Sequence, residues 1–473
     1  MKSQTVICDV CANDGASSPA TKCEKTAPGN DDEIKTERQY CSVCFGLADG
    51  DFVTQCCSIA LKELRAYRNV QGLMVQISQP AECSLRQAVV DLRSQLPTCE
   101  SDSKIRNRLR ELFTKTLFTL AAREQLPVNS TQSDLTVNIR LFTKYVKDDE
   151  GKTAEDEPNI KKPRLSLSSG SNDATSAGMT RKEARNALSR IDSLDVDQAE
   201  KFDLAVPNCL KVDFDVSIAR DPVCLAGRYC KYSRSLPQTP WLEGAEVESC
   251  DATKVSNRLV DSGNCVADLI AQPLKSAFQF DSYRFLASGR EDIDVRMLGD
   301  GRPFAIELLQ CRAVPDTFDA ALGRVNASTR DIRVTTMKRC GRKALETLKA
   351  GEQEKRKQYT ALCYCDVSVS ESQLSALCAL GEFAIQQHTP IRVLHRRTLC
   401  KRERQVKILR AWPASDDYRT FFVQLRTQAG TYVKELVHGD FGRTTPSLGD
   451  LMKLSNLDII ELDVDCVQLD WPL

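Results

Sequence analysis

The sequence is short of histidine and has no net charge. Only 3 of its 473 residues are histidine, and 65 Lys and Arg side chains are balanced by 65 Asp and Glu. So few histidines argue against a histidine-rich metal centre and against a mechanism that depends on histidine as acid or base. Because the net charge is zero, nucleic-acid binding cannot be inferred from total charge and must be argued from local clusters.

Long apolar runs are also missing. The first five residues, Met1–Thr5, do not begin an apolar signal-peptide core, and no run approaches the roughly 18 residues of a membrane span. We therefore expect an intracellular protein of the nucleus or the cytoplasm, not associated with a membrane. The spacing of Gly289, Gly299 and Gly301 does not match a phosphate-binding loop, so no nucleotide cofactor is indicated.

Cysteine, in contrast, is abundant, with 21 residues. Two Cys-x-x-Cys pairs lie near the N-terminus and predict a structural zinc site with four thiolate ligands: Cys8, Cys11, Cys41 and Cys44. Such a site leaves no open coordination position, so its role would be structural rather than catalytic. The alternative is a coincidence among many cysteines, of which Cys23, Cys56 and Cys57 are further candidates.

The pattern of apolar residues predicts a mixed α and β protein. Helices are expected over residues 104–124 and 371–384. Strands are expected over residues 135–141, 210–218, 304–309, 359–369, 391–395, 406–409 and 421–425. Residues 147–182 have almost no large apolar side chains and predict a disordered insertion. Within it, Lys161–Arg164 could be a nuclear import signal or a solvated basic patch in a linker.

The most informative segment is the charged loop Gly289–Gly299. It holds three acids and two arginines within eight positions, just before a predicted strand. A carboxylate flanked by arginine stays ionised and can act as a nucleophile or a base. On composition alone, a surface loop of self-paired charges is the better interpretation, because such ion pairs are common.

A resemblance to a known family favours a functional role for this loop instead. Residues 289–304, GREDIDVRMLGDGRPF, resemble the active-site motif of the archaeal and eukaryotic pseudouridine synthases that modify positions 54 and 55 of the tRNA T arm. The resemblance implies that Asp292 is the catalytic residue, with Asp294 the nearest competitor. It further implies that Arg290 fills the space left by the extruded base.

Two more motifs are similar to the same family. Lys357-Gln358-Tyr359 resembles a Lys-x-Tyr strand motif and implies that Tyr359 lies against the target base, where an aromatic ring can stack on a pyrimidine. Residues 430–436, GTYVKEL, resemble a second motif. There the resemblance implies that Lys434 pairs with Asp292 and that Leu436 lines the pocket beside the base.

Basic clusters supply the charge that RNA binding needs. Eight basic residues and one acid lie between Arg392 and Arg410. Residues 389–397 resemble the family's "thumb" loop, which implies RNA contacts by Arg396 and Arg397. A charge run alone is usually a solvated face, so this evidence is secondary.

The resemblance also implies the architecture. We expect an α+β protein in which residues 1–57 form a zinc-binding segment, 58–240 an α/β THUMP-type RNA-binding domain, and 241–473 a pseudouridine synthase domain with a mixed, mostly antiparallel central sheet. The expected partner is tRNA, with other structured RNAs left open, and the chain is expected to act as a monomer. Apart from the structural zinc, no cofactor is needed.

The predicted reaction breaks the bond between C1′ and N1 of uridine, turns the uracil and joins its C5 to C1′. Asp292 would act as a nucleophile at C1′ or as a base that removes the ribose 2′ proton. Two other functions stay open: an RNA-binding scaffold or processing factor that keeps the fold, and a zinc-ribbon interaction protein. The second leaves residues 227–450 unexplained.

Overall fold

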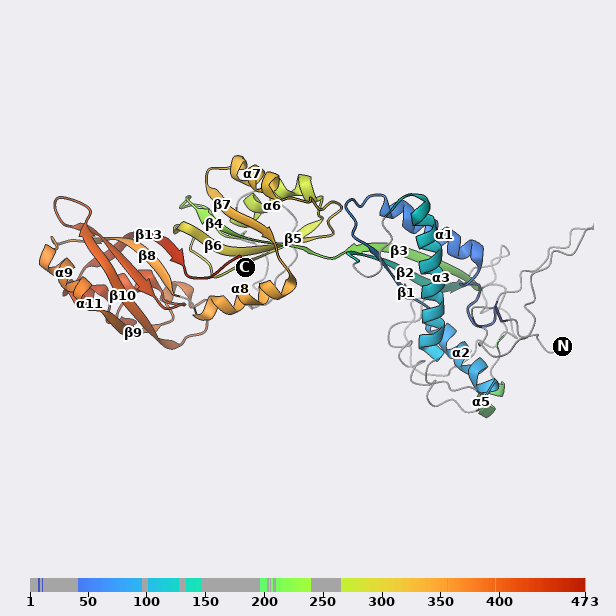
Figure 1. Ribbon diagram of the computed structural model, residues 1–473. Helices are drawn as coiled ribbons and strands as arrows, with labels where there is room; N and C mark the ends of the chain where they lie inside the picture. Colours follow the sequence, from blue (N-terminus) through green and yellow to red (C-terminus); the bar gives the residue numbers. More distant parts are fainter. Residues whose placement is uncertain are drawn as a thin grey trace, which may run out of the picture. The chain divides into compact units, whose positions relative to one another are not determined.

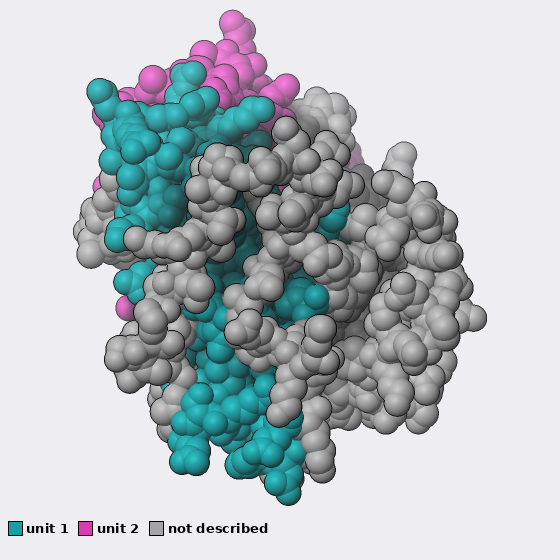
Figure 2. Space-filling view, turned by 90° about the vertical axis from the view of Figure 1, so that its right-hand side faces the viewer, with its two compact units in different colours: residues 1–221 teal, residues 222–473 magenta. Residues whose placement is uncertain are grey.

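The computed structural model describes residues 7–8, 11, 41–95, 101–126, 133–145, 196–201, 204, 206, 210–239, 265–354, 356–395 and 397–472. The predicted insertion at 147–182, including Lys161–Arg164, lies outside them. The chain forms two compact units, Met1–Asp221 and Pro222–Leu473, which Figure 2 colours separately. None of the described helices combines the length and the apolar character that a membrane crossing requires.

The first unit packs helices on a small sheet (Figure 1). Its helices are α1 (Gly50–Leu64), α2 (Ala81–Arg93), α3 (Ser101–Arg123) and α5 (Val196–Lys201). Its strands are β1 (Leu73–Ser78), β2 (Leu135–Tyr145) and β3 (Leu210–Arg220). Strand β2 lies in the middle, parallel to β1 and antiparallel to β3. The helix predicted at 104–124 and the strands predicted at 135–141 and 210–218 are confirmed.

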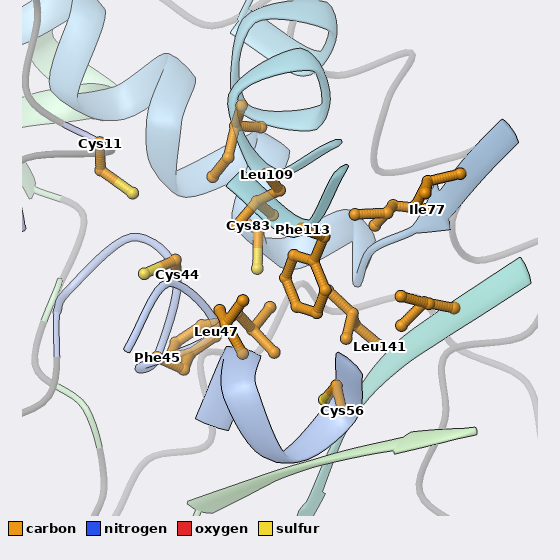
Figure 3. Close-up of a cluster of buried hydrophobic side chains, with 14 of the residues drawn as sticks. Cys11, Cys44, Phe45, Leu47, Cys56, Ile77, Cys83, Leu109, Phe113 and Leu141 are labelled. Carbon is orange, nitrogen blue, oxygen red and sulfur yellow. The ribbon is translucent and has the colours of Figure 1, made fainter. Parts of the chain in front are cut away.

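The core of this unit forms where α3 crosses the sheet. Phe113 and Leu109 of α3 have no exposed surface and face Leu141 of β2 and Ile77 of β1 (Figure 3). Burying one apolar side chain of this size stabilises the folded state by roughly 1.5–3 kcal/mol. The buried side chains of this unit form one continuous cluster, and their summed burial stabilises the unit. Helix α1 starts where the side chain of Asp49 accepts hydrogen bonds from two backbone amides of the first turn.

The second unit is built on one ten-stranded sheet. The strand order is β12-β9-β10-β11-β8-β13-β6-β4-β7, and β5 also pairs with β6. The bounds are β4 (Val223–Lys231), β5 (Ser282–Ala287), β6 (Arg296–Leu309), β7 (Ile332–Arg339), β8 (Lys357–Cys365), β9 (Glu382–His388), β10 (Lys401–Pro413), β11 (Thr420–Thr427), β12 (Thr444–Thr445) and β13 (Leu457–Val467). The pairings among these described strands are antiparallel except β6 with β13, so the predicted α+β fold with a mostly antiparallel sheet is confirmed.

Helices flank both halves of this sheet. They are α6 (Val266–Phe278), α7 (Asp319–Ser328), α8 (Arg342–Glu354), α9 (Glu371–Ala379), α10 (Val433–His438) and α11 (Leu448–Met452), with a short 3-10 helix η1 (Ile391–Val393). In Figure 1, α6 and α7 lie on one side of β4 and β7, and α8 lies on the other. Each half has its own hydrophobic core, one under α6 and α7 and one between α9 and β8, β10 and β11.

The two halves of the sheet meet at a seam. Residues Arg296 and Met297 of β6 pair with Asp463 and Val464 of β13, and this is the parallel pairing. The guanidinium of Arg296 also forms an ion pair with the Asp463 carboxylate at 2.5 Å. The charged loop Gly289–Gly299 runs directly into this seam, because its last four residues begin β6, so it lies where both halves can contribute side chains.

Three expectations differ from the structure. The helix predicted at 371–384 ends at Ala379, because Gly381 takes a positive φ of 74° and the chain continues as strand β9. The strand predicted at 359–369 ends at Cys365, and the strand predicted at 391–395 is instead the 3-10 helix η1, which starts after Pro390. The contacts divide the chain at Asp221, because β4 pairs with β6 and β7, and the domain ranges expected from the sequence stay a prediction.

Candidate active site

The charged loop is a tight connection between β5 and β6. Gly289 opens it with φ of 82°, and a β-carbon there would lie 2.7 Å from the ammonium of Lys357 and 3.0 Å from Arg302. Only glycine fits this conformation without displacing those side chains. The amide of Val295 donates to the carbonyl of Asp292 at 3.1 Å, which closes the loop. The loop therefore has one defined shape.

The buried side chain of Glu291 holds the charged loop in place. Its buried carboxylate accepts hydrogen bonds from Arg302 at 2.6 Å and from the Tyr229 hydroxyl at 2.8 Å. The amide of Gln238 donates to the same hydroxyl at 2.8 Å and to the carbonyl of Gly289 at 3.1 Å. A buried charge that is fully paired fixes its surroundings. With Glu291 directed inward, its neighbour Asp292 is left half exposed.

Lys231 supports the loop at the next two residues. It is fully buried, and its ammonium donates to the backbone carbonyls of Asp292 at 3.1 Å, Ile293 at 2.9 Å and Leu236 at 2.9 Å. Burial lowers the pKa of Lys231 to about 8, and the nearby carboxylates oppose that shift. Lys231 therefore fixes the backbone on which the predicted catalytic side chain stands.

Two cations approach the Asp292 carboxylate. Arg392 of η1 lies 3.0 Å from its Oδ2, and Lys434 of α10 lies 3.7 Å from the same atom. The structure thus brings the predicted pair Asp292 and Lys434 together, although Lys434 makes its shorter contacts, 2.7 and 2.9 Å, with Asp294. Burial opposes ionisation of Asp294, but the hydrogen bond from Lys434 and its charge lower the Asp294 pKa overall.

Arg392 is itself held in place. Its Nε donates to Oε1 of Glu435 at 2.7 Å, and Glu435 is buried on α10 beside Lys434. Within the described part of the chain, the other oxygen of Glu435 has no hydrogen-bond partner. One arginine therefore links the 3-10 helix, α10 and the charged loop. The sequence motifs do not predict that Arg392 and Glu435 form a pair, although the basic residues of 392–410 include Arg392.

Tyr359 lies on β8 beside this cluster. It pairs with Leu425 of β11 and Val464 of β13, and its side chain is partly buried. Burial raises the pKa of Tyr359 to about 12. The Arg302 guanidinium opposes this rise, whereas the charges of Asp292 and Glu291 contribute to it. The phenol of Tyr359 therefore stays neutral at physiological pH.

The other predicted site residues are less closely grouped. Arg290 is exposed on the charged loop, and Arg397 is exposed just after η1. Arg396 lies outside the described residues. Leu436 is fully buried in the hydrophobic core between α10 and the sheet. Contact between Leu436 and a base stays a prediction, since it would require this side chain to be uncovered.

The four predicted cysteine ligands form one cluster in the first unit. The sulfur atoms of Cys8, Cys11, Cys41 and Cys44 all lie within 4.8 Å of one another. The sulfurs of Cys8 and Cys44 are 3.6 Å apart, close to the separation of about 3.8 Å in a tetrahedral site with 2.3 Å metal–sulfur bonds.

Backbone amides complete the surroundings of this cluster. The amides of Cys8 and Val43 donate to the Cys41 sulfur at 3.4 and 3.5 Å. Hydrogen bonds from the other three thiols lower the Cys41 pKa, which favours the thiolate form. The cluster fits a four-coordinate metal ion.

Comparison with known proteins identifies relatives. The family model described as "Pus10, C-terminal" matches residues 224–468. A Xenopus laevis protein named tRNA pseudouridine synthase Pus10 is 42% identical over 296 residues, 62% of this chain and 54% of that protein. The Pus10 relative of Drosophila melanogaster is 31% identical over 446 residues, 91% of this chain and 84% of its own length.

An archaeal protein is similar too. The tRNA pseudouridine synthase Pus10 of Thermofilum pendens is 36% identical over 249 residues, which cover 52% of this chain and 53% of that protein. The chain spans about half the length of the vertebrate relatives that it matches. The matched region includes the charged loop, β8, η1 and α10, and therefore both cations described near Asp292, Arg392 and Lys434.

Proposed function

The chain belongs to the Pus10 family, and on that premise we propose that it isomerises uridine to pseudouridine in the T arm of tRNA, at position 54, position 55 or both. Relatives that bear the name tRNA pseudouridine synthase support the reaction and the class of substrate. The resemblance of residues 289–304 to the T-arm enzymes supports the positions. The charge that RNA binding needs comes from the basic residues of 392–410, not from the chain as a whole.

Asp292 is the proposed catalytic carboxylate. The observation that carries this assignment is a half-exposed carboxylate on a rigid loop, with Arg392 at 3.0 Å and Lys434 at 3.7 Å. The two cations hold the carboxylate in place, and a carboxylate can act as a nucleophile at C1′ or as a base at C2′. Both routes use the same atoms of Asp292.

The neighbouring side chains receive roles that match their chemistry. A uridine inside a folded RNA must be extruded before its glycosidic bond can be reached. The Tyr359 ring would hold the extruded base by stacking, and its raised pKa keeps the phenol uncharged during the reaction. Lys434 and Arg392 would hold the carboxylate in one orientation, and Arg290 would occupy the space that the base leaves.

A direct test uses an unmodified tRNA transcript. Pseudouridine is mapped by chemical derivatisation after incubation with the purified chain, and transcripts with cytidine at position 54 or 55 identify the site. We expect product with the wild type, and RNA binding without product for Asp292→Ala. The matched control is Asp416→Asn, which alters an exposed acid in the β10–β11 hairpin.

Two results would contradict the proposal. Product formation by Asp292→Ala would exclude Asp292 as the essential group. Tight RNA binding without any product from the wild type would favour the rival function, an RNA-binding scaffold or processing factor.

We also propose that the ion at the four-cysteine cluster is zinc. Four thiolates with no open position suit a structural zinc ion, which stabilises the fold when bound. We expect about one zinc per chain by elemental analysis and a clear loss of zinc in Cys41→Ser. The buried Cys57→Ser is the control, because Cys57 is outside the cluster and donates to the carbonyl of Phe113. Zinc content near zero, or unchanged by Cys41→Ser, would exclude this site.

A further inference from the structure

One aromatic side chain in the second unit is almost wholly exposed. Phe441 has 95% of its surface accessible, whereas Phe278, Phe304 and Phe421 of the same unit are fully buried in its cores. It lies in the turn that follows α10. A single exposed apolar side chain is common on protein surfaces and does not by itself indicate a ligand, so the backbone and the surroundings of Phe441 must decide.

The backbone of this turn is left-handed throughout. Gly439, Asp440, Phe441 and Gly442 have φ angles of 80°, 47°, 55° and 81°. Two of them carry side chains, and such residues rarely take positive φ, because the β-carbon crowds the backbone. Strain of this kind persists only where the surrounding structure imposes it, and it is frequent at ligand-binding sites.

Hydrogen bonds impose this conformation. The amide of Gly439 donates to the carbonyl of Glu435 at 2.8 Å, and the amide of Thr444 donates to the carbonyl of Gly439 at 3.0 Å. The buried Asp440 carboxylate accepts a hydrogen bond from the amide of Ile391 at 3.3 Å. The exposed ring is therefore presented by a fixed turn.

The turn is joined to the proposed active site through η1. Within this 3-10 helix, Arg392 contacts Asp292 while its neighbour Ile391 contacts Asp440. Helix α10 makes a second connection, since Lys434 lies near its start and Gly439 ends it, about 7–8 Å further along the axis at 1.5 Å per residue. Phe441 thus lies outside the group of residues that contact Asp292 but next to it.

The surface around Phe441 is polar and basic. Arg392 and Arg397 are exposed near η1, His438 is exposed at the end of α10, and Arg443 follows the turn. A shallow polar groove beside the turn is lined by His438, Gly442, Thr444, Ser447 and Asp450, among others. Arg392 and Arg443 already form ion pairs with acids of this chain. A nucleic acid offers phosphates for the basic side chains of this surface and a flat base for the ring, which is why RNA is the partner that fits.

We propose that Phe441 is a base-stacking residue, which binds a nucleotide of the RNA substrate other than the uridine that reacts. The proposal rests on the proposed function for the nature of the substrate. Phe441 contributes binding, because its ring contacts a nucleotide that takes no part in bond breaking. Its loss should therefore raise Kd and KM and leave the rate at saturating RNA unchanged.

The test compares three variants of the full chain. Phe441→Ala removes the ring and keeps the β-carbon, so the backbone strain is the same as in the wild type. Phe441→Leu keeps an apolar side chain without a ring, and Phe441→Trp keeps a ring. The control is Tyr364→Ala, which removes another exposed aromatic side chain, at the opposite end of β8 from Tyr359.

We expect Phe441→Ala and Phe441→Leu to weaken binding of the tRNA transcript roughly 5- to 150-fold, the range for loss of one base stack. Phe441→Trp and Tyr364→Ala should bind like the wild type. Saturating RNA should quench the indole fluorescence introduced by Phe441→Trp, measured against the wild type, which has three tryptophans. Circular dichroism and thermal unfolding check that each variant is folded.

Three outcomes would overturn the proposal. Phe441→Ala or Phe441→Leu could bind RNA like the wild type, or saturating RNA could leave the indole emission unchanged. Alternatively, Phe441→Ala could alter the oligomeric state and not the RNA affinity, which would assign the ring to a second copy of the chain. A wild type that binds RNA through Phe441 but forms no pseudouridine would contradict the proposed function and leave this inference standing.

Discussion

The ammonium of Lys434 lies 2.7 Å from a carboxylate oxygen of Asp294 and 3.7 Å from one of Asp292. The cation that the sequence assigned to Asp292 is therefore shared between two acids of the same loop. Arg392, at 3.0 Å, is the closer cation to Asp292. Because the two cations come from η1 and α10, the position of the Asp292 carboxylate depends on both segments.

This sharing leads to a prediction about the two acids. Asp294→Asn should leave activity within a few fold, because Lys434 can then pair with Asp292 alone. Lys434→Met should lower the single-turnover rate on the order of 10- to 100-fold, since a preorganised charge next to the reacting group is lost. Rapid quenching of one turnover measures both. If Asp294→Asn loses as much activity as Asp292→Asn, the catalytic assignment between the two acids is wrong.

A second prediction concerns Arg392 and its buried partner. Glu435→Gln removes the charge that holds Arg392 near Asp292, and we expect about a tenfold loss of rate, as for one charge-assisted hydrogen bond. Arg392→Ala should lower the rate at least as much. The double variant should lose no more rate than Arg392→Ala alone, because Glu435 acts on the reaction through Arg392. Arg356 and Glu382 form a solvent-exposed pair at 3.0 Å and supply the control. Additive losses would mean that Glu435 acts independently of Arg392.

A third prediction concerns stability. Glu291 and Arg302 are both buried and paired at 2.6 Å, so Glu291→Ala leaves an uncompensated buried guanidinium. We expect this to lower the free energy of unfolding by about 3–5 kcal/mol. Asp281→Ala breaks an exposed pair with Arg312 at the same distance and should cost about 0–1 kcal/mol. Denaturant unfolding measures both, and equal effects would contradict the buried-pair interpretation.

The lowered pKa of Lys231 predicts a pH dependence. Its folded pKa is about 8, below the usual value of about 10.4, so the unfolded chain binds more protons between these two pH values. Stability therefore rises with pH across this window, by about 3 kcal/mol at most, relative to a chain without the titrating group.

Comparison with Lys231→Met isolates that contribution. Unfolding free energies of the two chains are measured from pH 7 to pH 10.5, and the wild type should gain on the variant as pH rises above 8. The variant loses three hydrogen bonds to carbonyls, which shifts its whole curve without adding a pH dependence. Parallel curves would show that Lys231 titrates normally.

Much of the candidate site could be predicted from motifs. The loop around Asp292, the strand at Tyr359 and the helix start at Lys434 are local segments with recognisable residue order, and the structure brings them together. Composition alone favoured a solvated loop. The four-cysteine cluster could be predicted because two thiols on one turn already fix half of a tetrahedron.

The supporting residues could not be predicted in the same way. Lys231 looks like any strand lysine, and its role depends on carbonyls about sixty positions away in the chain. Arg392 was one of many basic residues, and its partners lie in two other segments. The expected strand at 391–395 failed because Pro390 removes a donor and the chain turns into η1. Which arginine reaches Asp292 depends on the tertiary fold.

The parallel pairing of β6 with β13 has a consequence for how the protein is made. The loop that carries Asp292 belongs to one half of the sheet and Lys434 to the other, and β13, the last described strand, joins them. A ribosome must therefore deliver the residues up to the end of β13, at Val467, before the carboxylate can meet its cations. Nascent or C-terminally cleaved molecules would hold all the motif residues before β13 and still lack an assembled site.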